Sequence, residues 1–115
     1  MANLTLFLDD DLDTLSMYKA IFKNKGLYVS NIPDAFLQYQ IYKPKLIFLD
    51  FFIKGEHPLD FIEYVKKDNS KVDIYVITGY SIAAPLRLFN FNLDHLFKKP
   101  VELNKLKILV ERMAI

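Results

Sequence analysis

Seven polar residues at the ends of apolar runs could together bind a metal ion and accept an anion. In chain order they are Asp9, Asp10, Asp11, Asp50, Thr78, Lys98 and Lys99. Taken singly, each type has a common structural role: an Asp after a strand often caps a helix, a Thr forms a turn, and a Lys is solvated. Their shared position after successive apolar runs is what points to chemistry.

The carboxylates of Asp9, Asp10 and Asp50 would repel one another if folding brought them together. Two like charges about 4 Å apart repel by about 4 kcal/mol at an effective dielectric constant of 20. Mg²⁺ would relieve this repulsion, because it binds carboxylate oxygens and leaves positions open for phosphate oxygens. With Lys99 as a second, compact positive charge, a carboxylate could act as a nucleophile toward phosphorus.

The surrounding sequence alternates short β-rich apolar runs with segments of helical period, which is typical of βα units. The predicted strands are 4–8, 27–30, 46–49, 72–77 and 94–97, and five helices follow them, the fourth within 81–91. Gly26 is predicted to end the first helix in a left-handed conformation. We therefore expect an α/β fold with a doubly wound five-stranded parallel sheet in the flavodoxin-like order 2-1-3-4-5 and five helices.

This topology would gather the polar residues. In an open parallel sheet, ligands bind beyond the carboxyl ends of the strands. Asp9 and Asp10, Asp50, Thr78 and Lys99 each follow a predicted strand at that end. The sequence therefore predicts one pocket at this edge of the sheet.

The amino-acid composition limits which kinds of function the chain can have. The chain has 115 residues, enough for a single domain spanning 1–115, and 52% of them are hydrophobic, which predicts a folded globular protein. Its net charge of +1 argues against direct binding of nucleic acid. The sequence has no cysteine and no apolar stretch of the roughly 20 residues that span a bilayer, so we expect a cytoplasmic location without membrane contact.

Four motifs resemble those of response regulator receiver domains, in the same order and over nearly the whole chain. They are LFLDD at 6–10, LIFLD at 46–50, YVITG at 75–79 and FKKP at 97–100. Each motif is weak by itself, but the joint match is far more specific.

For the metal site, the resemblance implies that Asp50 is the phosphoacceptor and Asp10 a direct Mg²⁺ ligand. Asp9 would act largely through metal-bound water, and Phe52 would offer its backbone carbonyl. The run of three Asp residues leaves a one-residue ambiguity, with Asp11 in the acidic place that often follows the pair.

For the phosphoryl group, the resemblance implies that Thr78 hydrogen-bonds one oxygen and Lys99 pairs with another. Lys99 is preferred to Lys98 because it forms the Lys-Pro pair with Pro100, whose peptide bond is expected to be cis.

The chain departs from the family pattern in two places. The loop after Asp50 reads FFIKGEHPLD, with Lys54 and Pro58 where Pro and Gly are common. Leu96 stands where many receivers carry an aromatic residue that moves on activation.

The implied partners are a histidine kinase or phosphotransfer protein as donor and a downstream protein or output domain. A homodimer is also expected through the region of Phe89 and Phe91. The receiver would catalyse its own phosphorylation and dephosphorylation without being an enzyme for a separate substrate. His57 and His95 lack a second ligand at metal-binding spacing and are expected to be exposed.

Two alternatives stay open. The chain could be a receiver-like interaction module that works without phosphorylation, since its loop is unusual. It could also be a haloacid-dehalogenase-like phosphatase with Asp9 as nucleophile and Asp11 as acid-base partner. Against the phosphatase, Asp50 intervenes before Thr78 and no acidic pair follows Lys99.

Overall fold

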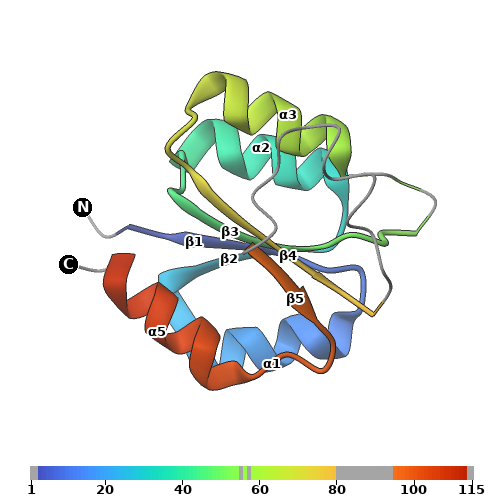
Figure 1. Cartoon of the computed structure of the whole chain (residues 1–115), viewed down its shortest axis with the longest axis vertical. Coiled ribbons are helices and arrows are strands. Elements are labelled where there is room, and N and C mark those ends of the chain that lie inside the picture. Colours follow the sequence, from blue (N-terminus) through green and yellow to red (C-terminus); the bar gives the residue numbers. More distant parts are fainter. Residues whose placement is uncertain (1–2, 55, 57, 80–94, 114–115) are drawn as a thin grey trace.

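The computed structural model describes residues 3–54, 56, 58–79 and 95–113. Five strands form one parallel sheet in the order β2-β1-β3-β4-β5, which confirms the predicted topology (Figure 1). The strands are β1 (Thr5–Leu8), β2 (Gly26–Val29), β3 (Leu46–Asp50), β4 (Asp73–Thr78) and β5 (Leu96–Lys98). They agree with the predicted runs to within two residues at each end.

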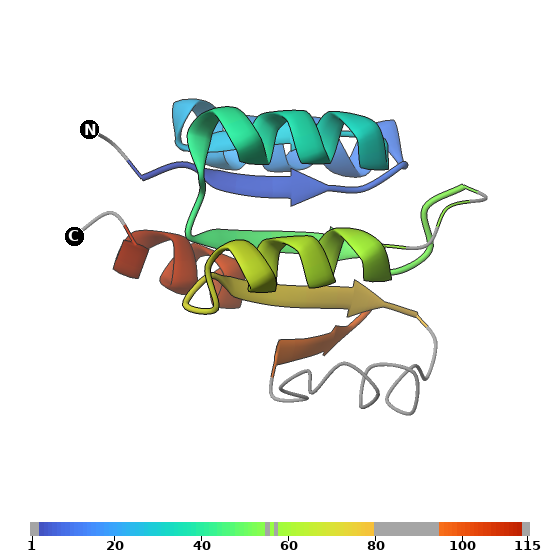
Figure 2. The same cartoon turned by 90° about the horizontal axis from the view of Figure 1, so that it is seen from above.

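Helices cover both faces of the sheet, as the doubly wound prediction requires. Those described are α1 (Leu12–Phe22), the short 3₁₀ helix η1 (Lys23–Lys25), α2 (Ile32–Tyr42), α3 (Leu59–Asp68) and α5 (Leu103–Met113). Helices α2 and α3 lie on one face and α1 and α5 on the other (Figures 1 and 2). The fourth helix predicted within 81–91 lies outside the described residues. No helix in the described part of the chain is long and apolar enough to cross a bilayer.

Local sequence explains where the helices begin and end. Asn31 caps α2 by accepting a hydrogen bond from the Asp34 amide at 2.8 Å, and Pro33 sits in the first turn, where its missing N–H costs nothing. The prediction for Gly26 is wrong: it lies in β2 with φ −121°, and Lys23 takes the positive φ of 50° after α1. The chain leaves α1 three residues earlier than expected, through η1.

Strand residues alternate between two hydrophobic cores, one under α2 and α3 and one under α1 and α5. The second core contains a row of directly paired rings, Tyr28, Phe7, Phe48 and Tyr75, with neighbouring centroids 5.4 to 5.5 Å apart. His95 continues the row by stacking on Tyr75 at 4.2 Å. It is therefore half-buried rather than exposed as predicted, while His57 lies outside the described residues.

Candidate functional site

The strand ends place the predicted residues side by side. Leu8 of β1 pairs with Leu49 of β3, so the next residue of each strand, Asp9 and Asp50, stand level with each other on neighbouring strands. The Asp9 amide extends the ladder by donating to the Val29 carbonyl oxygen at 3.1 Å. Backbone pairing thus fixes both carboxylates at the carboxyl edge of the sheet.

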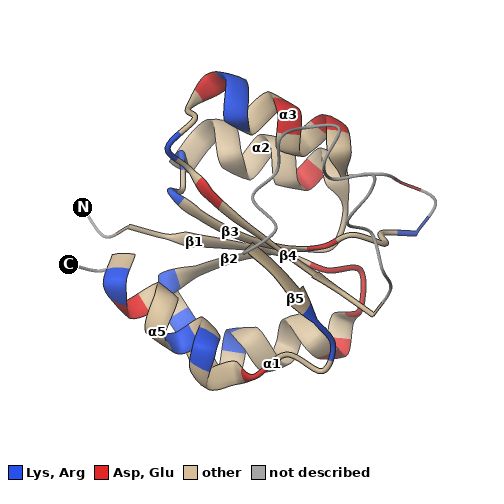
Figure 3. Cartoon of the chain, in the orientation of Figure 1, with Lys and Arg blue, Asp and Glu red and all other residues tan. Residues whose placement is uncertain are grey.

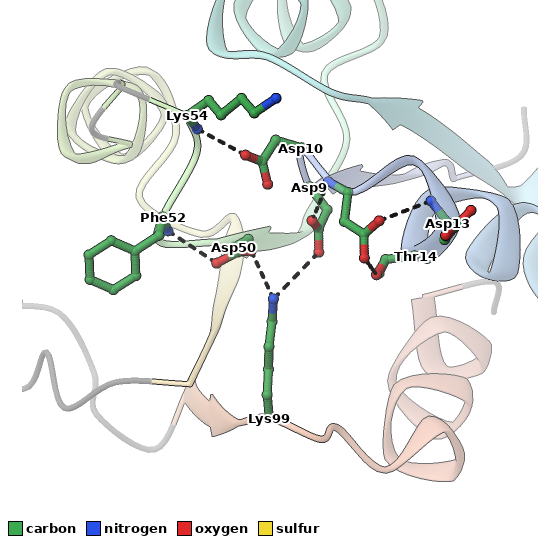
Figure 4. Close-up of polar contacts among 9 residues, drawn as sticks. Asp9, Asp10, Asp13, Thr14, Asp50, Phe52, Lys54 and Lys99 are labelled. Carbon is green, nitrogen blue, oxygen red and sulfur yellow. Dashed lines mark hydrogen bonds and ion pairs between the residues drawn. The ribbon is translucent and has the colours of Figure 1, made fainter.

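Asp9, Asp10 and Asp50 form an acidic cluster (Figure 4). One carboxylate oxygen from each residue lies within 4.8 Å of the others. Asp9 and Asp50 are only 3% and 7% exposed, whereas Asp10 is half-buried. Charged groups taken out of water need compensation, so this cluster requires a positive partner.

Lys99 supplies that partner from the end of β5. Its Nζ lies 2.9 Å from Oδ2 of Asp50 and 4.0 Å from Oδ2 of Asp9. The Lys99 amide also donates to the Thr78 carbonyl oxygen at 3.0 Å, which fixes the backbone below the ammonium group. Among the described residues, Lys99 and not Lys98 makes the ion pairs with Asp9 and Asp50. The peptide bond between Lys99 and Pro100 is cis, as expected.

The cluster perturbs the acidity of its members. Burial raises the pKa of the Asp9 carboxyl to about 6, and the negative charges of Asp50 and Asp10 act in the same direction. The amide of Asp11, 2.9 Å from Asp9 Oδ1, opposes this shift in part. Burial alone would lower the pKa of the Lys99 ammonium, but the hydrogen bond and charge of Asp50 outweigh it and raise this pKa. Asp9 is therefore held in a site that disfavours its charge.

Asp11 lies outside the cluster and caps α1. Its Oδ1 accepts from the Asp13 amide at 3.1 Å and its Oδ2 accepts from the Thr14 hydroxyl at 2.8 Å. The Thr14 hydroxyl and the Asp13 amide hold the pKa of Asp11 below its usual value. Of the three consecutive Asp residues, Asp9 and Asp10 thus belong to the acidic cluster and Asp11 does not.

We expect Asp11→Ala to lower the melting temperature by a few degrees, because α1 loses its cap. Asp11→Ser should largely retain the wild-type value, since a serine oxygen can still accept from the Asp13 amide in the first turn. Mg²⁺ affinity should stay within about twofold in both variants. A large loss of Mg²⁺ affinity in Asp11→Ser would place Asp11 among the metal-binding groups.

Thr78 and Phe52 complete the predicted set. Thr78 is fully buried at the end of β4, one residue beyond Ile77, which pairs with Asp50. The Phe52 amide donates to Asp50 Oδ1 at 3.1 Å, while its ring is half-exposed and points away from the acidic cluster (Figure 4). Both residues therefore border Asp50, Thr78 from the neighbouring strand and Phe52 from the loop that follows.

Sequence reasoning missed one contact of the cluster. The backbone amide of Lys54 donates to Asp10 Oδ2 at 3.0 Å. Every residue except proline carries such an amide, so only the path of the loop decides which carboxylate it reaches. Receiver domains commonly carry a proline at this position, and the lysine found here was the signal that a backbone N–H is available.

The charges of the site fit a divalent cation. Among the described residues, three clustered carboxylates face the single ammonium group of Lys99, which leaves an excess of two negative charges if all ionise. Oxygen ligands from a few carboxylates, with room for water, suit Mg²⁺. Asp10, Asp50 and Asp9 are the side chains that would hold it.

A groove of about 530 Å³ lies beside the site, between α1 and the segment from β5 to α5. Its lining includes Lys99 and Asp11 near the cluster and Met17, Tyr18 and Leu103 farther along.

The basic residues of α5 and of the end of α1 lie away from the acidic edge (Figure 3). The site is therefore open to solvent on its α1 side and differs in charge from the opposite end of the molecule.

The sequence matches no protein-family model and shows no significant match among curated proteins. Solved structures, in contrast, match over nearly the whole chain. A response regulator receiver domain protein from Clostridium thermocellum superposes with a TM-score of 0.80 at 16% identity, over 99% of this chain and 94% of that one.

Two further structures agree. The beryllofluoride-activated NtrC4 receiver domain dimer gives a TM-score of 0.79 at 17% identity, over 97% of this chain and 96% of that one. The non-phosphorylated HemR receiver domain from Leptospira biflexa gives 0.78 at 20% identity, over 96% and 92%. This chain has the fold of the response regulator receiver domains.

Proposed function

We propose that this chain is a phosphoacceptor receiver of a two-component signalling system. Asp50 would take a phosphoryl group from a histidine kinase or phosphotransfer protein in a Mg²⁺-dependent reaction. The observation that carries this proposal is the placement of Asp50 in the acidic cluster with its Oδ2 2.9 Å from Lys99, on a fold shared with receiver domains. The switch in charge at Asp50 would then alter the interactions of the domain with its partners.

In the transfer step, a carboxylate oxygen of Asp50 forms a bond to phosphorus while the bond from phosphorus to the donor imidazole nitrogen breaks. Bound Mg²⁺ would neutralise charge on the phosphoryl oxygens. The Phe52 amide holds Oδ1 of Asp50 and Lys99 holds Oδ2, so the nucleophile is oriented before the donor arrives. The ammonium of Lys99, on its flexible stem, can follow the charge from the carboxylate to a phosphoryl oxygen.

The role of Thr78 follows from its place beside Asp50. After transfer, the hydroxyl of this fully buried residue would hydrogen-bond a phosphoryl oxygen. A movement of Thr78 toward the phosphoryl group would transmit the change in charge to the rest of the domain. The domain catalyses only its own phosphorylation and dephosphorylation, so we do not propose turnover of a separate substrate.

The proposal includes a cytoplasmic location and a downstream protein partner or output domain. The proposed homodimer contact through Phe89 and Phe91 lies outside the described residues. The phosphatase alternative is disfavoured by Asp11, since its carboxylate is engaged with Asp13 and Thr14 and caps α1 instead of facing a substrate beside Asp9.

Incubation with acetyl phosphate and Mg²⁺, followed by intact-mass measurement, tests the proposal. We expect the mass of one phosphoryl group to be added to the wild type and to be absent from Asp50→Asn. The matched control is Asp60→Asn, an exposed carboxylate on α3, which should be phosphorylated normally. An adduct that persists in Asp50→Asn would exclude Asp50 as the acceptor. Absence of any adduct would favour the phosphorylation-independent module, and steady hydrolysis of a generic phosphate ester would favour the phosphatase.

A further inference from the structure

The loop after β3 is fastened at three points around the acidic cluster. The Phe51 amide donates to the Ile77 carbonyl oxygen at 3.3 Å and so extends the pairing of β3 with β4. The Phe52 amide donates to Asp50 Oδ1 at 3.1 Å, and the Lys54 amide donates to Asp10 Oδ2 at 3.0 Å (Figure 4). Two alternate amides of one loop thus hold two carboxylates of the cluster, which come from different strands.

Burial explains why the loop stays in this position. Phe51 and Ile53 are 3% and 2% exposed and belong to the core under α2 and α3, whereas Phe52 and Lys54 point outward. The Glu56 amide closes the turn by donating to the Ile53 carbonyl oxygen at 2.7 Å. Burial and this hydrogen bond both hold Ile53 in place. The backbone therefore fixes the position of the next amide, that of Lys54, beside Asp10.

This contact leaves the two oxygens of Asp10 in different environments. Oδ2 accepts from Lys54, while the other oxygen points away from Lys54 toward the side of Asp9 and Asp50 (Figure 4). We propose that the Lys54 backbone amide is a positioning group for Mg²⁺, holding the Asp10 carboxylate so that its second oxygen faces the metal position. This inference rests on the proposed function, because it takes Asp10 to be a metal ligand.

The physical reason is that the half-buried Asp10 side chain can rotate unless a second group holds it. Hydrogen bonds to ligating carboxylates orient them, and loss of such a bond typically lowers metal affinity about 10- to 100-fold. The same bond joins the loop to the end of β1. Mg²⁺ at Asp10 should therefore also hold the loop segment from Phe52 to Lys54 more firmly in place.

Lys54→Pro and Lys54→Ala form a matched pair for the test. Both remove the charged side chain, but only proline removes the backbone N–H. Mg²⁺ binding is measured by calorimetric titration of the full chain without a phosphoryl donor. We expect Lys54→Pro to bind Mg²⁺ about tenfold more weakly than wild type, and Lys54→Ala to stay within about twofold of it.

Proline could also distort the backbone of the loop, so two further measurements test the role of the N–H without a proline ring. An ester in place of the amide at position 54, made with the α-hydroxy analogue of lysine, removes the N–H and keeps the side chain; it should show the same loss of affinity as Lys54→Pro. In the wild type, hydrogen exchange of the Lys54 amide should slow when Mg²⁺ is added.

Equal Mg²⁺ affinity in the ester and the wild type, or tighter binding by the ester, would overturn the inference and leave the phosphoacceptor proposal standing. Faster exchange of the Lys54 amide with Mg²⁺ would overturn it too, because the bond would then belong to the metal-free state alone. Failure of the wild type to bind Mg²⁺ would overturn both proposals.

Discussion

Replacement of Lys99 with methionine is expected to slow formation of the aspartyl phosphate on Asp50 by about 100- to 1,000-fold. The ammonium lies 2.9 Å from Oδ2 of Asp50, beside the atom that would receive the phosphoryl group. Methionine has a similar length but no charge, so the loss reports on electrostatics. The rate is measured as the growth of the phosphorylated mass with acetyl phosphate and Mg²⁺.

Lys98→Met is the matched control for this prediction. Lys98 precedes Lys99 directly, but the ion pairs with Asp50 and Asp9 are made by Lys99, so replacement of Lys98 should change the rate less than about twofold. Mg²⁺ binding should persist in Lys99→Met, because removal of a positive charge from the cluster favours a cation. A similar rate in the two variants would show that the Lys99 contact has no role in the transfer step.

Metal-free protein is expected to lose stability as the pH rises through about 6, because of Asp9. The pKa of Asp9 in the folded chain is about 6 against an ordinary value of 3.8, so the folded state binds more protons than the unfolded state between these values. The contribution of Asp9 to stability is therefore fully present below pH 3.8 and is lost as the pH rises past the folded-state pKa. A shift of this size corresponds to about 3 kcal/mol at neutral pH.

Asp9→Asn isolates this effect, since asparagine keeps an oxygen that can accept from the Asp11 amide and carries no charge. We expect the metal-free variant to be more stable than wild type by about 3 kcal/mol at pH 7 and to match it near pH 4. Chemical denaturation at a series of pH values measures the difference. Asp13→Asn, an exposed carboxylate in the first turn of α1, serves as control and should follow the wild type.

Mg²⁺ should offset the loss of stability that the buried charge of Asp9 causes, because it binds the folded state. Saturating Mg²⁺ is expected to stabilise wild type more than Asp9→Asn, because only wild type carries the buried charge that the cation relieves. Parallel stability curves for the two proteins over pH 4 to 8, with or without Mg²⁺, would contradict the assignment of the raised pKa to Asp9.

Periodicity along the chain was sufficient to predict the sheet. The apolar runs at 46–49 and 72–77 favour central strands, and β3 and β4 lie there. Every residue of β3 is buried, and in β4 only Asp73 and Tyr75 are half-buried. Gly26 shows the limit of such local signals. A glycine permits a positive φ without requiring it, and here the positive φ falls on Lys23, directly after α1, while Gly26 is extended.

By itself, the sequence determined which residue types would meet at the carboxyl edge, because parallel strands end at the same edge of a sheet. Asp9, Asp10, Asp50, Thr78 and Lys99 each follow a predicted strand. The sequence could not decide whether Asp11 joins the cluster or caps α1, since both roles use the same carboxylate. Only the tertiary structure decided that, and only it brought the Lys54 amide to Asp10. Contacts between backbone groups and residues 44 positions away depend on the path of a loop, which side-chain patterns do not encode.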